Sequence, residues 1–116
     1  MDQAIEVIKW FNNHSRALGL LKQRMLEKLF KVYVLILPVI TRWTSHYLSC
    51  KRLLLVATAM RTLVLDFYDE LVICAGDKRE MKDKAKEILD LVNEPSFWHD
   101  LVEYASQLTT HPMLCH

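Results

Sequence analysis

Residues 53–65 read Leu-Leu-Leu-Val-Ala-Thr-Ala-Met-Arg-Thr-Leu-Val-Leu, and this stretch decides the fold. Apolar side chains stand at nearly every position, so a helix formed here is apolar on all sides and must be buried among other elements. Thr44 or Ser45 can cap such a helix, which then runs to about Leu65, a span of about 22 residues or roughly 33 Å. Because Arg61 interrupts the run before the roughly 20 residues that cross a bilayer, we predict a central helix of a soluble protein.

Amphipathic helices are predicted on both sides of this central helix. Ser15 is expected to be the N-cap of the second helix, Gly76 suits the end of a helix, and Pro95 suits the first turn of the last one. Apolar residues recur every three to four positions in four stretches. These are Ile5, Ile8 and Phe11; Leu18, Leu21, Met25, Leu29 and Val32; Met81, Ala85, Ile88, Leu89 and Val92; and Phe97, Leu101, Tyr104 and Leu108. The second and third stripes are expected to pack against the central helix.

The stretch from Tyr33 to Thr41 is β-branched and apolar, and it predicts an extended conformation. Pro38 cannot continue a helix, and it restrains Leu37 to extended backbone. With two glycines and three prolines in 116 residues, long helices are favoured over a meander of short strands. The predicted fold is mainly α, with five or six helices and one short extended segment around residues 33–41. Residues 1–110 are expected to form a single unit, followed by an irregular tail over 111–116.

The net charge of +1 hides an uneven distribution along the chain. Residues 1–61 hold ten Lys and Arg against three Asp and Glu, a charge of +7, whereas residues 62–116 hold five against eleven, a charge of −6. Such asymmetry suggests that the first half faces a polyanion or an acidic partner. Alternatively, the two halves neutralise each other in the folded chain. Composition leaves both interpretations open.

Enzymatic chemistry finds little support in the remaining motifs. Cys50, Cys74 and Cys115 lie far apart and form neither a disulfide framework nor a Cys-x-x-Cys pair, which indicates reduced thiols inside the cell. No signal peptide, nucleophile elbow or glycine-rich phosphate loop is found. Potential metal ligands lie close together only in the tail, where they lack the second pair of ligands that a structural zinc site needs. The acids of residues 80–90 alternate with lysines, as is typical of a solvated helix face. The tail ligands are His111, Cys115 and His116, and the helix acids are Glu80, Asp83, Glu87 and Asp90.

A guanidinium, an indole, a phenol and several hydroxyls come together in the segment Thr41-Arg42-Trp43-Thr44-Ser45-His46-Tyr47. Arginine binds phosphate through paired hydrogen bonds, and an aromatic face can stack on an unpaired base. The start of a helix adds unsatisfied backbone N–H donors. Alternatively, Trp43 and Tyr47 are core aromatic residues one turn apart, and Arg42 pairs with a nearby acid. The residue types alone favour the core interpretation slightly, and both interpretations stay open.

Leu37-Pro38-Val39-Ile40-Thr41-Arg42-Trp43-Thr44-Ser45-His46-Tyr47-Leu48 resembles the T-R-W-[NT]-S segment of hAT-family transposases. Residues 7–14, Val-Ile-Lys-Trp-Phe-Asn-Asn-His, are similar to the helix that precedes that segment in the family. Ile88-Leu89 and residues 96–101, Ser-Phe-Trp-His-Asp-Leu, are similar to the pattern that follows it. The resemblance covers about residues 4–104, and the sequence after Leu108 does not share it.

This resemblance implies an RNase H-like transposase whose catalytic core is interrupted by a helical insertion, and a chain that is an internal fragment of that region. The family's two catalytic aspartates precede the T-R-W segment and its glutamate follows much later, so no acid of this chain is expected to be catalytic. The chain is therefore expected not to be an enzyme and to hold no cofactor, while the parent family uses Mg²⁺. Arg42 and Trp43 are the implied DNA-binding residues, at the transposon end.

The resemblance also implies a nuclear location and partners other than DNA, namely the remaining transposase core or a second copy. The alternative function is a helical protein-interaction or dimerisation module without a DNA-binding role. The basic half of the chain would then dock an acidic partner. Binding to DNA that weakens steeply with salt distinguishes the two functions.

Overall fold

The computed structural model describes residues 2–38 and 43–109, with only the backbone for Trp43 and Thr109. This part of the chain contains six α-helices and no strand, which confirms the predicted mainly-α fold with five or six helices. The helices are α1 (Asp2–Asn13), α2 (Ser15–Leu29), α3 (Trp43–Leu55), α4 (Ala57–Cys74), α5 (Arg79–Asn93) and α6 (Pro95–Thr109). Within the described ranges, no helix is both long and apolar enough to cross a membrane.

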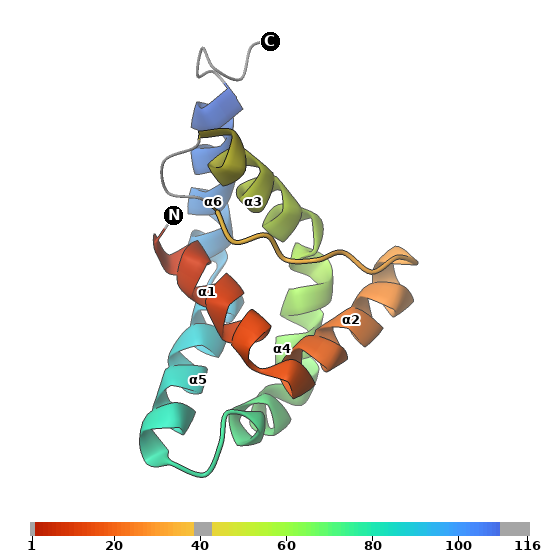
Figure 1. Cartoon of the computed structure of the whole chain (residues 1–116), viewed down its shortest axis with the longest axis vertical. Helices are drawn as coiled ribbons and strands as arrows, with labels where there is room; N and C mark the ends of the chain where they lie inside the picture. The colour runs from red at the N-terminus through yellow and green to blue at the C-terminus, as the bar shows by residue number, and fades with distance from the viewer. Residues whose placement is uncertain (1, 39–42, 110–116) are drawn as a thin grey trace.

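Helix α4 lies at the centre of the molecule, packed between α2 and α5, while α3 packs along α6 (Figure 1). Helix α1 contacts both α2 and α5. The predicted stripes face inward at their centres, because Leu21 and Met25 on α2 and Ile88 and Leu89 on α5 are fully buried. Met81, the first residue of the predicted α5 stripe, is instead 45 % exposed. Met60 and Leu63 of α4 are buried with the centres of both stripes in one core. The predicted packing of two amphipathic helices against a central one is therefore confirmed.

The single central helix predicted to run to Leu65 is wrong, because the chain forms two helices there. Val56 separates α3 from α4 with φ −94° and ψ 5°, outside the α-helical region. This bend directs α3 toward α6 and α4 toward α2 and α5, so each half of the apolar run is buried against different neighbours. Val56 itself is fully buried, whereas Leu54 is half-buried. Helix α4 then continues through the acidic segment to Cys74, with a kink at Phe67 (φ −126°, ψ 30°).

The predicted N-caps are also wrong. Helix α2 begins at Ser15 itself and its N-cap is His14, while α3 begins at Trp43, so Thr44 and Ser45 lie within its first turn. The ring of His14 stacks on Trp10 at 4.5 Å and its Nδ1 lies 2.6 Å from the carbonyl oxygen of Trp10. These contacts fix the corner between α1 and α2, and they replace a hydroxyl cap. Gly76 follows α4 with a φ of 125°, as expected for a residue that ends a helix.

The extended segment is confirmed over residues 32–38, which cross the front of the helices between α2 and α3 (Figure 1). Residues 39–41 of the predicted segment lie outside the described residues. Leu35 is buried, and the Ser49 hydroxyl of α3 donates a hydrogen bond to the carbonyl oxygen of Ile36 at 2.6 Å. Val32, predicted to be part of the α2 stripe, is instead exposed in this segment, because α2 ends at Leu29. The segment is thus fastened to α3, the helix that begins at Trp43.

Candidate nucleic-acid interface

The T-R-W segment lies at the start of α3. Trp43 is the first residue of this helix, so the unsatisfied N–H groups of the first turn are located at this segment. Arg42 lies outside the described residues, and the side chain of Trp43 is not described. One turn further along α3, Tyr47 is half-buried and packs against the core. Tyr47 is therefore partly a core residue, as the alternative interpretation of this segment predicts. For Arg42 and Trp43, both the DNA-binding and the core interpretation stay open.

A group of cations and one aromatic ring lies beside the last turn of α3, which contains Arg52. The Nζ atom of Lys31 is 5.4 Å from the centre of the Tyr33 ring, and the Cζ atom of Arg52 is 5.3 Å from the same centre. We call Lys31, Tyr33 and Arg52 the Tyr33 cluster. On α3 itself, Lys51 lies over the ring of Tyr47, with its Nζ 5.7 Å from the ring centre. Cations and aromatic rings thus alternate along the extended segment and α3.

The sequence of this region contains no acid of its own. From Lys28 to Leu65 the sequence holds no Asp and no Glu. In the described ranges, none of Lys28, Lys31, Lys51 and Arg52 takes part in an ion pair. Clustered cations without counter-charges produce a positive potential that attracts polyanions. The surface formed by the extended segment and α3 therefore fits a negatively charged ligand.

Other cations of the basic half are neutralised within the fold. The Nη2 atom of Arg16 lies 3.1 Å from Oε1 of Glu70, and the Nη1 atom of Arg24 lies 2.7 Å from Oδ2 of Asp66. Both pairs join the basic helix α2 to the acidic part of α4. The basic and acidic halves of the chain therefore neutralise each other at α2, as one of the two interpretations of the charge asymmetry predicts. The described ion pairs do not extend this neutralisation to the Tyr33 cluster.

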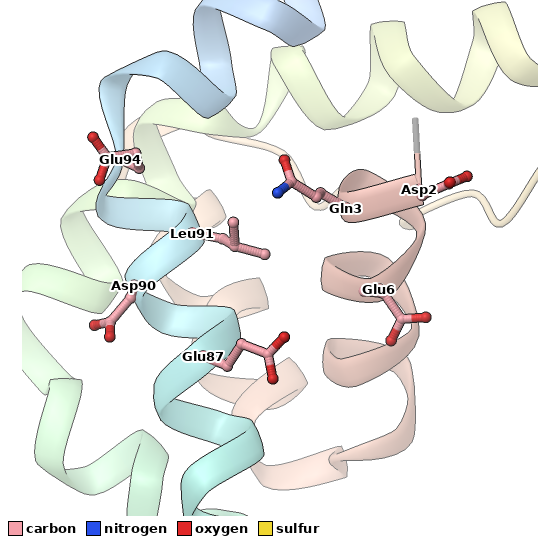
Figure 2. A pocket seen from close by; sticks show the side chains of 7 residues that line it. All are labelled: Asp2, Gln3, Glu6, Glu87, Asp90, Leu91 and Glu94. Carbon is pink, nitrogen blue, oxygen red and sulfur yellow. The ribbon is translucent and has the colours of Figure 1, made fainter.

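The acids gather elsewhere, around a cavity of about 430 Å³ between α1 and α5. Five acidic residues line it, with Gln3 and Leu91, and Figure 2 shows the side chain of Glu87 directed toward α1, while those of Asp90 and Glu94 point away from it. The five acidic residues are Asp2, Glu6, Glu87, Asp90 and Glu94. Lys84 Nζ lies 3.3 Å from Glu6 and 3.9 Å from Glu87, and it offsets part of this charge. A phosphate would be repelled here, which leaves the Tyr33 cluster and α3 as the candidate interface.

Neither thiol nor metal chemistry is supported by the described residues. Cys50 is fully buried in α3, and burial raises the pKa of its thiol to about 11, so a reactive thiolate is disfavoured at neutral pH. Cys74 is half-buried. In the described ranges, no group of three His, Cys, Asp or Glu residues is placed to hold a metal ion. The predicted tail ligands His111, Cys115 and His116 lie outside those ranges.

Helix α5 has the solvated charged face that the sequence predicts. Glu80, Asp83, Glu87 and Asp90 are all exposed. Two of them take part in ion pairs along the helix, Arg79 with Asp83 and Lys84 with Glu87, both at 3.9 Å. These acids therefore serve as a solvent-facing surface rather than as a pair of metal-binding carboxylates.

Sequence reasoning singled out Arg42, Trp43 and Tyr47 but missed Tyr33, Lys51 and Arg52. The available signal was the long stretch without acids, which contains all six residues. Comparison with protein-family models, with curated proteins and with solved structures gave no match for this chain.

Proposed function

We propose that this chain is a non-catalytic helical part of a hAT-type transposase and that it helps to hold transposon-end DNA. Arg42 binds phosphate and Trp43 stacks on an exposed base at the start of α3. The resemblance of residues 4–104 to the family, centred on the T-R-W segment, gives this proposal its family and its ligand.

One structural observation carries the DNA-binding part of the proposal. Helix α3 begins at Trp43, inside the stretch from Lys28 to Leu65 that holds six cations and no acid. The first turn of a helix offers backbone donors to phosphate, and the cations of this stretch add attraction for a polyanion.

The proposal assigns catalysis to the remainder of the parent transposase. Its Asp, Asp and Glu residues would bind Mg²⁺, and the present chain would supply helical scaffolding and DNA contacts in the nucleus. No carboxylate of this chain is proposed to act in strand cleavage or joining.

Salt-dependent binding tests the proposed function. A fluorescently labelled duplex should bind with a dissociation constant of roughly 10⁻⁴ to 10⁻⁶ M near physiological salt, and the affinity should fall steeply as salt rises. Replacing Lys51 by Gln should weaken binding, whereas Lys86→Gln, the same charge change on the exposed face of α5, should leave it nearly unchanged. An affinity that does not depend on salt would contradict a phosphate-based interface.

A second candidate function, a protein-interaction or dimerisation module, is favoured by apolar side chains near the end of α2. Phe30 has a left-handed backbone (φ 61°) and is 88 % exposed, and Leu26 and Val34 are 53 % and 65 % exposed. A non-glycine residue rarely adopts this conformation, and exposed aromatic side chains of this kind are common in interfaces. Sedimentation of the wild type and of Phe30→Ser tests it, since only this function predicts concentration-dependent association that the substitution abolishes.

A further inference from the structure

Two cations from different elements are held on one tyrosine ring. Lys31 follows α2 and Arg52 belongs to α3, yet both lie within about 5.5 Å of the centre of the Tyr33 ring. Bringing like charges together is unfavourable unless other groups compensate. The electron-rich ring compensates in part, and so does the Val34 carbonyl oxygen, which accepts a hydrogen bond from Nη1 of Arg52 at 3.1 Å. The cluster is therefore assembled before any ligand arrives.

The Tyr33 cluster has unused capacity to bind an anion. A guanidinium carries five N–H donors, and the described part of the chain provides Arg52 with a single acceptor, the Val34 oxygen. Lys31 is exposed, and no described carboxylate pairs with it or with Arg52. Oxygen atoms of an anion would thus satisfy donors that the fold leaves available.

The geometry points to a phosphate backbone rather than a base. Since both cations already occupy positions over the Tyr33 ring, a base stacked there would have to displace them. Phosphate oxygens, in contrast, can bind both cations while these stay on the ring, with Arg52 as a bidentate donor and Lys31 as a point charge. We infer that the Tyr33 cluster binds the phosphate backbone of DNA, an inference that rests on the proposed function.

The test compares a double variant, Lys31→Gln with Arg52→Gln, with a control double variant, Lys78→Gln with Lys86→Gln. Both remove two positive charges, but the control removes them at and near the exposed face of α5. Binding of a labelled duplex and of one of its single strands is measured from roughly 50 to 200 mM salt. At the lowest salt the first variant should bind both substrates at least about tenfold more weakly, and the salt slope on the duplex should fall by about two units. The control should stay within about twofold of the wild type.

The single variant Lys31→Gln guards against misfolding, because Lys31 is exposed and its replacement should leave the melting temperature unchanged while lowering the slope by about one unit. If the wild type binds DNA but the double variant keeps its affinity and slope, the inference about the cluster is overturned and the proposed function stands. A loss confined to the single strand also overturns it, since that result indicates stacking. Absence of binding by the wild type overturns both.

Discussion

Arg24 and Asp66 form the shortest ion pair between the basic and the acidic halves of the described chain, with Nη1 of Arg24 2.7 Å from Oδ2 of Asp66. The Arg24 side chain is only 12 % exposed, and its guanidinium also lies over the ring of Phe67 at 5.5 Å. Phe67 is the residue at which α4 departs from helical geometry. One arginine of α2 is therefore packed against the kink of the central helix, where it serves the fold and is withdrawn from any DNA-binding surface.

Asp66→Asn should destabilise the protein by about 1–2 kcal/mol, more than a surface pair is worth, because the nearly buried Arg24 would lose its strongest partner. Asp83→Asn is the matched control, since its partner Arg79 is 94 % exposed at 3.9 Å, and it should cost less than about 0.5 kcal/mol. Urea unfolding of both variants measures the difference. Equal effects would show that Arg24 does not depend on Asp66.

Truncation of the α4 core should be costly only on its buried side. Leu63 is 1 % exposed, and Leu63→Ala should lower the free energy of unfolding by about 2–5 kcal/mol. Leu65, two residues along the same helix, is 71 % exposed, and Leu65→Ala should cost under about 1 kcal/mol. Denaturant unfolding followed by circular dichroism compares them. A similar loss for both would mean that α4 is not oriented as described.

Stability should decline at alkaline pH through Cys50. Its pKa is raised by burial from 9.0 in the unfolded chain to about 11, so between these values the unfolded state releases the proton first and unfolding becomes more favourable. The thiol should account for a loss of about 2–3 kcal/mol between pH 8 and 11. Burial also raises the pKa values of Tyr68 and Tyr104, so the measurement is the difference between the wild type and Cys50→Ala. If both lose stability in parallel, the Cys50 thiol is not the cause.

The isolated chain should not cut or join DNA. With Mg²⁺ or Mn²⁺ present, nicking of a hairpin or of a transposon-end duplex should not exceed that of a metal-free control, since the proposed function assigns no catalytic acid to this chain. Gel analysis of labelled substrates provides the measurement. A metal-dependent cleavage or joining activity that co-purifies with the chain would contradict this assignment.

Helix periodicity was sufficient to predict α1, α2, α5 and α6, because each has one apolar face that repeats every three to four residues. It was insufficient for α3 and α4. In a run that is apolar on all sides, such as Leu53–Leu65, no apolar face shifts from one side of the helix to another, so the sequence pattern does not indicate where the helix bends. The break at Val56 depends instead on which helices are available as packing partners. Likewise, the corner at His14 depends on its contact with Trp10, which a hydroxyl-capping rule does not include.

The candidate interface was predictable in part. The T-R-W segment is visible in the sequence, and so is the absence of acids between Lys28 and Leu65. The Tyr33 cluster was not, because Lys31 and Arg52 are distant along the chain and meet only when the extended segment crosses α3. The pairing of Arg16 and Arg24 with acids of α4 is a tertiary feature for the same reason.

Replacement of Trp43 separates the two interpretations of the T-R-W segment. If Trp43 stacks on DNA, Trp43→Ala should keep its melting temperature. If Trp43 is a core residue, the substitution should cost about 3–5 kcal/mol of stability, as is expected for Trp98→Ala. Trp98 is a suitable reference, since it is 5 % exposed and its Nε1 donates a hydrogen bond to the Val92 carbonyl oxygen at 2.8 Å. Arg42→Ala should weaken single strand and duplex alike and lower the salt slope by about one unit.

The most direct test of the central claim is the affinity of Trp43→Ala for a single strand and for the matching duplex, measured together with its melting temperature. We predict an unchanged melting temperature, a loss of about 1–3 kcal/mol in binding to the single strand, and a smaller loss on the duplex, which presents no free base face. An unfolded variant, or one that binds every substrate as the wild type does, would contradict a role for Trp43 in DNA binding.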